Sequence, residues 1–158
     1  MEDGLSPKDI EIIDISNRHF VIFSNTPWKE NKIKILVNGI EDANLFPGGV
    51  NINFAYLKSK KEIDLIVWER GTGITLACGS GACASFYAAI SLGVISKDEV
   101  LILDKKKGKL VNSDSCSNQN KNYIKINFKL GYLKLCFNKN NEILMRGNSQ
   151  YCFRGNII

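Results

Sequence analysis

The segment from residue 71 to residue 96 contains no charged residue, and this constrains the fold of the chain more than any other feature. A helix that spans a membrane needs about 20 consecutive, mainly apolar residues. Glycine and serine recur throughout the segment, so it is too small and too polar for such a helix. It instead predicts a helix that is buried inside a globular domain, and no membrane segment is expected.

Residue periodicity predicts the elements that surround this buried helix. Small and apolar residues recur at helical spacing over Ser80–Leu92, and Gly93 follows where helices commonly end. Apolar residues also recur at helical spacing over Glu30–Ile40, which predicts an amphipathic helix. Short apolar runs predict strands at Ile10–Ser16, His19–Ser24, Val50–Lys58, Glu62–Glu69, Glu99–Leu103, Ile124–Lys129, Leu133–Phe137, Ile143–Arg146 and Gln150–Arg154.

These elements predict one α+β domain over residues 1–158, in which a curved, mixed and mostly antiparallel sheet wraps around a buried central helix. A chain of 158 residues is long enough for one such core and short for two. Residues 104–122 are rich in Lys, Asn, Ser and Asp and offer little to bury, so we expect a flexible insertion there.

Charge and cysteine content limit the class of protein. The net charge is +5, but the lysines are spread along the chain, which predicts a solvated surface and no binding of nucleic acid. Five cysteines without a Cys-x-x-Cys pair, and no signal peptide at Met1–Pro7, predict a cytoplasmic protein with reduced thiols. A single histidine, His19, argues against a zinc site, and no metal is expected.

The residues that carry chemistry are concentrated around the start of the buried helix. A predicted strand ends in Glu69 and Arg70, a glycine-rich loop follows, and Cys78 then stands at the helix start. The unpaired N–H groups and the positive end of a helix favour the thiolate form of a cysteine. The N–H groups of Gly79, Ser80 and Gly81 can also bind an incoming carboxylate.

The residues alone leave other interpretations open. Cys78 can be an inert packing residue, because cysteines between small residues are often buried. The Gly-Ser-Gly turn could bind a phosphate, although it lacks the lysine and the spacing of a P-loop. A cysteine hydrolase is a third interpretation, with His19 as the base and Asn17 near it.

Residues 68–84, Trp-Glu-Arg-Gly-Thr-Gly-Ile-Thr-Leu-Ala-Cys-Gly-Ser-Gly-Ala-Cys-Ala, resemble the second active-site motif of diaminopimelate epimerases. Asn17-Arg18-His19 is similar to the Asn-Pro-His of that family, with Arg18 in place of proline and Ser16 where glycine is usual. The segment Phe46–Phe54 and the chain from Leu133 to the C-terminus resemble further parts of the family, in the expected order.

The resemblance implies one lobe of the diaminopimelate epimerase-like fold and a role in the epimerisation of LL- to meso-diaminopimelate, a step of lysine and peptidoglycan precursor synthesis. In the family, two cysteines act on opposite faces of the α-carbon without pyridoxal phosphate or any other cofactor. The resemblance assigns catalytic roles to Cys78, Glu69 and His19. It assigns substrate binding to Asn17, Asn51, Glu69, Arg70, Gly79 and Ser80.

The family enzyme has two similar lobes, and this chain resembles the C-terminal one. Cys116, Cys136 and Cys152 lack a glycine-flanked helix start, so none is a candidate for the partner cysteine. We therefore expect a complementing N-terminal lobe as a partner, with a homodimer as a further expectation, and little or no activity from the chain alone. A catalytically incomplete remnant, a module that binds small anions or another protein, and a cysteine hydrolase remain as alternatives.

Overall fold

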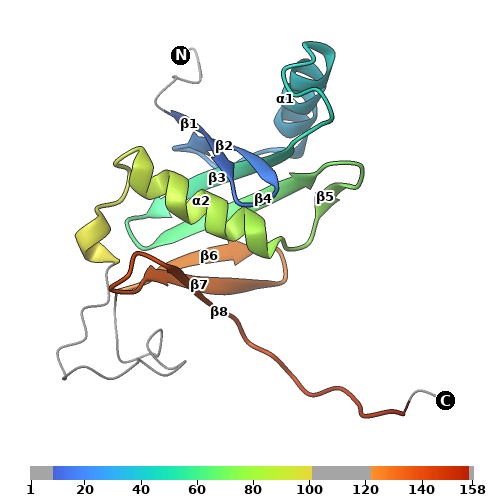
Figure 1. The fold of residues 1–158 in the computed structure, drawn as a ribbon. Helices are drawn as coiled ribbons and strands as arrows, with labels where there is room; N and C mark the ends of the chain where they lie inside the picture. Colours follow the sequence, from blue (N-terminus) through green and yellow to red (C-terminus); the bar gives the residue numbers. More distant parts are fainter. Residues whose placement is uncertain (1–8, 101–121, 157–158) are drawn as a thin grey trace.

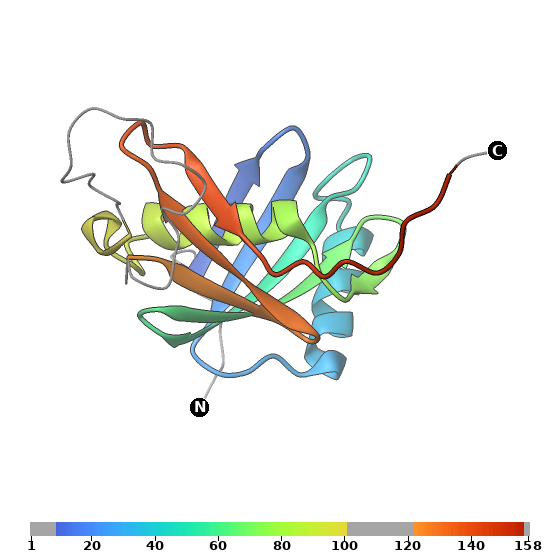
Figure 2. The same ribbon diagram turned by 90° about the horizontal axis from the view of Figure 1, so that it is seen from below.

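The structure, a computed structural model, describes residues 9–100 and 122–156. Within these ranges an eight-stranded sheet curves around helix α2 (Gly79–Ser91), and helix α1 (Glu30–Asp42) lies on the opposite face (Figures 1 and 2). This is the α+β arrangement that the sequence predicts. The strands are β1 (Ile10–Asp14), β2 (Arg18–Ser24), β3 (Asn51–Ser59), β4 (Glu62–Glu69), β5 (Gly73–Thr75), β6 (Ile124–Phe128), β7 (Gly131–Phe137) and β8 (Ile143–Arg146).

The sheet is mixed, with the strand order β1-β2-β3-β4-β6-β7-β8 and with β5 paired to β4. The β2–β3 and β4–β6 pairs are parallel, and the other pairs are antiparallel. Parallel neighbours require a long crossover connection, for which a helix is the usual element. Here α1 lies in the connection from β2 to β3, and α2 lies in the connection from β4 to β6.

The central strands are covered on both faces, which explains their continuous apolar sequences. In β2, Val21 and Phe23 belong to the core around α2, whereas Ile22 belongs to the core beneath α1. The same alternation divides β3, where Ala55 faces α2 and Phe54 faces α1. Which face a residue occupies is therefore fixed by its parity along the strand.

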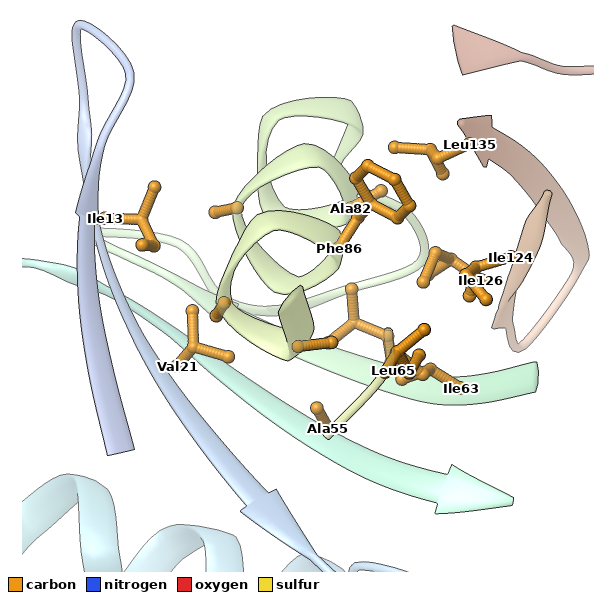
Figure 3. Packing of buried hydrophobic residues seen from close by; sticks show 14 of the residues in the cluster. Ile13, Val21, Ala55, Ile63, Leu65, Ala82, Phe86, Ile124, Ile126 and Leu135 are labelled. Atoms are coloured by element: carbon orange, nitrogen blue, oxygen red, sulfur yellow. The ribbon is translucent and has the colours of Figure 1, made fainter. Parts of the chain in front are cut away.

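Helix α2 buries one side against the concave face of the sheet, while Tyr87 on its other side is 47% exposed. Its small residues, such as Ala82, allow strands from both sides to approach closely, and Phe86 fills the space toward β6 and β7 (Figure 3). The ring of Phe86 lies 5.0 Å from that of Phe137, centroid to centroid. In the described part of the chain, no helix is long and apolar enough to cross a membrane. The uncharged segment is thus a buried helix, as predicted.

Most of the predicted elements are present with ends shifted by one or two residues, but three expectations differ from the structure. Residues 150–154 form no strand and are exposed, because the chain leaves the sheet after β8 and has no neighbouring strand to pair with (Figure 1). Of the predicted strand at Glu99–Leu103 only residues 99 and 100 are described, and Glu99 there ends a 3-10 helix at Lys97–Glu99, held by the hydrogen bonds Glu99 N–H to Ser96 O and Val100 N–H to Lys97 O. Strand β5 was not predicted, because it lies within the glycine-rich loop.

Two further expectations concern the insertion and the thiols. Residues 101–121 lie outside the described part of the chain, and with them nearly all of the predicted insertion at 104–122. Cys78, Cys83 and Cys152 are free thiols, whereas Cys136 is disulfide-bonded. The expectation of reduced thiols is therefore wrong for Cys136, because pairing depends on which side chains fold next to one another and not on the number of cysteines.

The core around α2 predicts the effect of truncating its aromatic side chain. Phe86→Ala should lower the free energy of unfolding by about 3–5 kcal/mol, because the buried ring leaves a cavity. The matched control is Phe153→Ala, which removes a ring that is 84% exposed and should change stability by less than about 0.5 kcal/mol. Urea denaturation followed by circular dichroism measures both. Equal effects of the two substitutions would contradict the position of α2.

Candidate active site

Cys78 is the N-cap residue of α2, at the position that the sequence predicts. Its backbone is extended (φ −141°, ψ 111°), and its Sγ accepts a hydrogen bond from the N–H of Gly81 at 3.3 Å. The N–H groups of Gly79 and Ser80 lie in the first turn, where a helix provides no intrahelical acceptor. The Gly81 N–H, in contrast, is already bound to the sulfur, so the expectation that it receives a carboxylate is not supported.

Gly81 is required by the close approach of α2 to β4. A Cβ at this position would lie 3.1 Å from Val67 Cγ2 and 3.3 Å from the Cys78 sulfur. A larger residue would push the first turn away from the sheet and lengthen the hydrogen bond to the thiol. Cys78 itself is 9% exposed, so the sulfur lies mostly under its neighbours.

Ser80 links the thiol to two predicted site residues at the start of β2. Its Oγ lies 3.4 Å from Cys78 Sγ and 3.1 Å from His19 Nε2. Asn17 Nδ2 donates to the same oxygen at 3.3 Å. One hydroxyl therefore connects the cysteine at the helix start with Asn17 and His19.

Asn53 is a residue of this cluster that sequence reasoning missed. Its side chain is fully buried, with Oδ1 lying 3.0 Å from His19 Nδ1 and Nδ2 donating to the carbonyl of Gly81 at 2.8 Å and to Ser85 Oγ at 3.0 Å. The parallel register pairs Val21 with Asn53, so His19 and Asn53 are diagonal neighbours on the face toward α2. A polar residue between apolar neighbours on a core-facing position was the available signal.

The environment of His19 favours its neutral form. Burial lowers the pKa of His19 below its usual value, and this effect exceeds the opposing influences of the Asn53 hydrogen bond and the negative charge of Glu69. Cys83 lies further along α2 against the core, where burial and the nearby Cys78 raise the pKa of its thiol. Cys83 is thus a packing thiol of the core around α2.

Glu69 and Arg70 do not pair with each other but bind separate partners. Thr75 Oγ1 donates to Glu69 Oε1 at 2.5 Å, which joins β5 to the end of β4. Arg70 donates from its backbone N–H to Asn51 Oδ1 at 3.0 Å and from its guanidinium to the carbonyl of Gly48 at 2.7 Å. The guanidinium stem crosses directly over Gly49, where φ is +80° and a Cβ would collide with it.

A polar cavity of about 310 Å³ lies beside this arginine, and its lining includes Asn17, Arg18, Asn51 and Arg70. Cys78 does not line the cavity; Asn17 connects the two regions, because it lines the cavity and also binds Ser80. Arg18, which stands where the family has proline, forms an ion pair across the β1–β2 turn: its Nε lies 3.9 Å from Asp14 Oδ2.

Ser16 also lines this cavity, and its φ of 73° is in the left-handed region that favours glycine. The backbone conformation at Ser16 is therefore one that suits the glycine usual at this position in the family that the chain resembles.

A larger cavity of about 680 Å³ lies beside α1 and contains none of the predicted site residues. Its lining includes Trp28, Ile33, Ile66 and Leu76. In the part of the chain that the structure describes, no group of three or more His, Cys, Asp and Glu side chains could hold a metal ion. The predicted site residues Asn17, Asn51 and Arg70 line the smaller, polar cavity, and His19 and Ser80 lie beside Cys78.

Proteins of known family resemble this chain in sequence. A sequence profile of the family described as "Diaminopimelate epimerase" matches residues 12–136. The diaminopimelate epimerase of Rickettsia bellii (strain OSU 85-389) is 42% identical over 111 residues, which cover 66% of this chain and 40% of that protein. That of Rickettsia typhi (strain ATCC VR-144 / Wilmington) is 41% identical over 114 residues, which cover 72% of this chain and 40% of that protein.

A solved structure of a Bacillus anthracis phenazine biosynthesis protein of the PhzF family also matches, with a TM-score of 0.48 and 16% sequence identity. The match covers 80% of this chain and 33% of that one.

The sequence matches define a class of isomerases, the epimerases. The chain belongs to the diaminopimelate epimerase family. It covers about 40% of the length of the curated relatives that it matches.

The buried His19 predicts how stability depends on pH. Because the pKa of His19 is lowered in the folded chain, the unfolded chain binds a proton first as the pH falls below about 6.5. The free energy of unfolding should then decrease by at most about 1.4 kcal/mol per pH unit until the folded chain is protonated too. Urea denaturation between pH 7.5 and pH 5 measures this.

The control is His19→Gln, which removes the only histidine and should remove this part of the pH dependence, leaving that of the carboxylates. Identical pH dependence in the two chains would show that His19 is not held in its neutral form.

Proposed function

We propose that this chain supplies one of the two acid/base thiols of a cofactor-independent epimerase that converts LL- to meso-diaminopimelate, with Cys78 as that thiol. The observation that carries the proposal is the N-cap position of Cys78, where its sulfur receives the Gly81 N–H at the positive end of α2. Membership of the diaminopimelate epimerase family supports the reaction class. A cytoplasmic location and a role in lysine and peptidoglycan precursor synthesis are parts of the same proposal.

The proposed reaction is a transfer of two protons at one carbon. The Cys78 thiolate takes the α-proton and becomes a thiol, which leaves negative charge on the α-carbon and its carboxylate. A thiol on the opposite face then gives its proton to that carbon and becomes a thiolate, so the centre is inverted. The N–H groups of Gly79 and Ser80 are placed to stabilise the carboxylate at the helix start.

The polar cavity beside Arg70 is the proposed site for the far end of the substrate. Asn51 binds the backbone N–H of Arg70 and the Gly48 carbonyl binds its guanidinium, which lowers the cost of ordering this side chain for a ligand. A guanidinium binds a carboxylate through charge-assisted hydrogen bonds. Asn17 and Asn51 line the same cavity and offer amide groups, and Glu69 is the proposed partner of the substrate ammonium.

A second lobe is part of the proposal, because the described residues provide only one suitable thiol. Cys83 of α2 packs against the core, and Cys136 of β7 is disulfide-bonded, whereas Cys152 lies in the exposed chain after β8. Exposed apolar side chains near the thiol also support a covering partner. Leu76 is 56% exposed and Met145 is 50% exposed, and Met145 approaches Gly79.

The proposal predicts that inversion requires an added N-terminal lobe with the partner cysteine. LL-diaminopimelate is incubated in deuterated solvent; mass spectrometry measures the deuterium taken up, and chiral chromatography measures the inverted product. The 158-residue chain should give little or no inversion, and its mixture with the N-terminal lobe should give clear inversion. Cys78→Ala should lower the rate of the mixture by roughly 10²–10⁴-fold. Cys152→Ala, which removes an exposed thiol, is the matched control.

Strong inversion by the isolated chain would contradict the requirement for two lobes. Release of acid from ester substrates, combined with no α-proton exchange, would indicate a cysteine hydrolase instead.

The proposed substrate site predicts that Arg70→Gln weakens binding of diaminopimelate by roughly ten- to a hundredfold, because one charged hydrogen-bonding partner is lost. Isothermal titration calorimetry on the mixture of the two lobes measures this. Lys60→Gln is the matched control: it also removes one positive charge, but at the β3–β4 turn, at the opposite end of β4 from Arg70. Equal losses in both variants would indicate general electrostatic attraction and not a specific site.

A further inference from the structure

The buried amide of Asn53 determines which nitrogen of His19 carries the hydrogen. The Gly81 carbonyl can only accept a hydrogen bond, so the atom of Asn53 that faces it must be the NH₂ group. The amide oxygen of Asn53 therefore faces His19 Nδ1, at 3.0 Å. An amide oxygen can only accept, so Nδ1 carries a hydrogen and Nε2 of the neutral ring is left as an acceptor.

When Cys78 is protonated, the hydrogen bonds of Ser80 have one arrangement that also gives His19 Nε2 a donor. The single hydrogen of Ser80 must point to His19 Nε2, which accepts at 3.1 Å. Its oxygen accepts from Asn17 Nδ2, which can only donate, and has a second lone pair for Cys78 at 3.4 Å. The Cys78 thiol is therefore the donor toward Ser80, and every donor in the cluster has an acceptor.

We propose that Cys78, Ser80 and His19 form a proton relay, in which Asn53 is a positioning residue that holds His19 in the accepting tautomer. The Cys78 S–H bond breaks as its proton moves to Ser80 Oγ, and the Ser80 O–H bond breaks as its own proton moves to His19 Nε2. The products are a thiolate, an unchanged serine hydroxyl and an imidazolium, and the reverse transfer restores the thiol. The relay rests on the proposed function, since it loads and unloads an acid/base thiol.

The charged groups around the relay are consistent with a proton that is carried only temporarily. Burial disfavours the imidazolium, whereas Glu69 and the Asn53 oxygen favour it, so His19 is neutral at rest and can still accept a proton. On the sulfur side, the Gly81 N–H stabilises the thiolate, and Cys83 is the titratable group next along α2. Ser80 thus gains a role beyond the carboxylate binding that the resemblance assigns to it.

The test is the pH dependence of Cys78 alkylation by iodoacetamide in the 158-residue chain, quantified by mass spectrometry of the Cys78 peptide. Cys78 is 9% exposed, so a small reagent is used, and the exposed Cys152 is an internal reference whose rate should not change. Ser80→Ala should shift the profile to higher pH and lower the rate at pH 7 by roughly tenfold, and Ser80→Thr, which keeps the hydroxyl, should restore it.

His19→Gln should have the same effect as Ser80→Ala, and the double variant should be no slower than either single one, because the two residues act in one chain. Additive effects, or a Ser80→Ala profile like that of the unaltered chain, would overturn the relay. Imidazole ¹⁵N chemical shifts of the single histidine test it in the unaltered chain. They should show that Nδ1 is protonated and Nε2 is unprotonated at neutral pH. The opposite tautomer would also overturn the relay.

Neither measurement requires a substrate or a second lobe. If the relay passes these tests but the chain mixed with an N-terminal lobe never exchanges the α-proton of diaminopimelate, the proposed function is refuted and the relay is not. If the mixture exchanges the α-proton but the effects of Ser80→Ala and His19→Gln on the alkylation rate are additive, the relay is refuted and the proposed function is not.

Discussion

The packing of α2 against the concave face of the sheet positions the rest of the site, and it has an apolar and a polar part. The alanines and Phe86 of the helix pack against strands on both sides, and Gly81 lets the first turn approach β4. Asn53 reaches from β3 to the Gly81 carbonyl and to Ser85, so it fastens that turn to the sheet. Because Cys78 directly precedes this turn, its sulfur is placed by contacts that are themselves buried.

The two parts of the proposed site differ in how they are built. The thiol is held by main-chain and buried side-chain groups, which cannot move without disturbing the core. The arginine lies at the end of β4, where it is oriented by turns and by the amide of Asn51. This division suits an enzyme in which the proton-transfer geometry is rigid and the surface cavity selects the substrate. Enclosure by a second lobe would exclude water and strengthen the electrostatic contacts on both sides.

The structure also shows where local sequence patterns were insufficient. The apolar run at residues 150–154 has the composition of a strand, but a strand exists only when a neighbour offers its hydrogen-bonding groups. Strand β5 shows the reverse, because Gly73–Thr75 is a three-residue piece of a glycine-rich loop and pairs with β4 only because the loop folds back onto it. The buried position of Cys78 likewise results from neighbours that are distant in sequence.

The sequence alone determined the helices, most of the strands, the family and the position of Cys78 at a helix start. These depend on periodicity, glycine placement and a motif, all of which act over a few residues. Only the tertiary structure decided that Asn53 holds His19 and that Ser80 stands between His19 and the thiol. These contacts join residues 34 and 61 positions apart, and they arise from the parallel register of β2 and β3 and from the seating of α2 on them. No local pattern encodes a hydrogen bond whose partners meet only when the core closes.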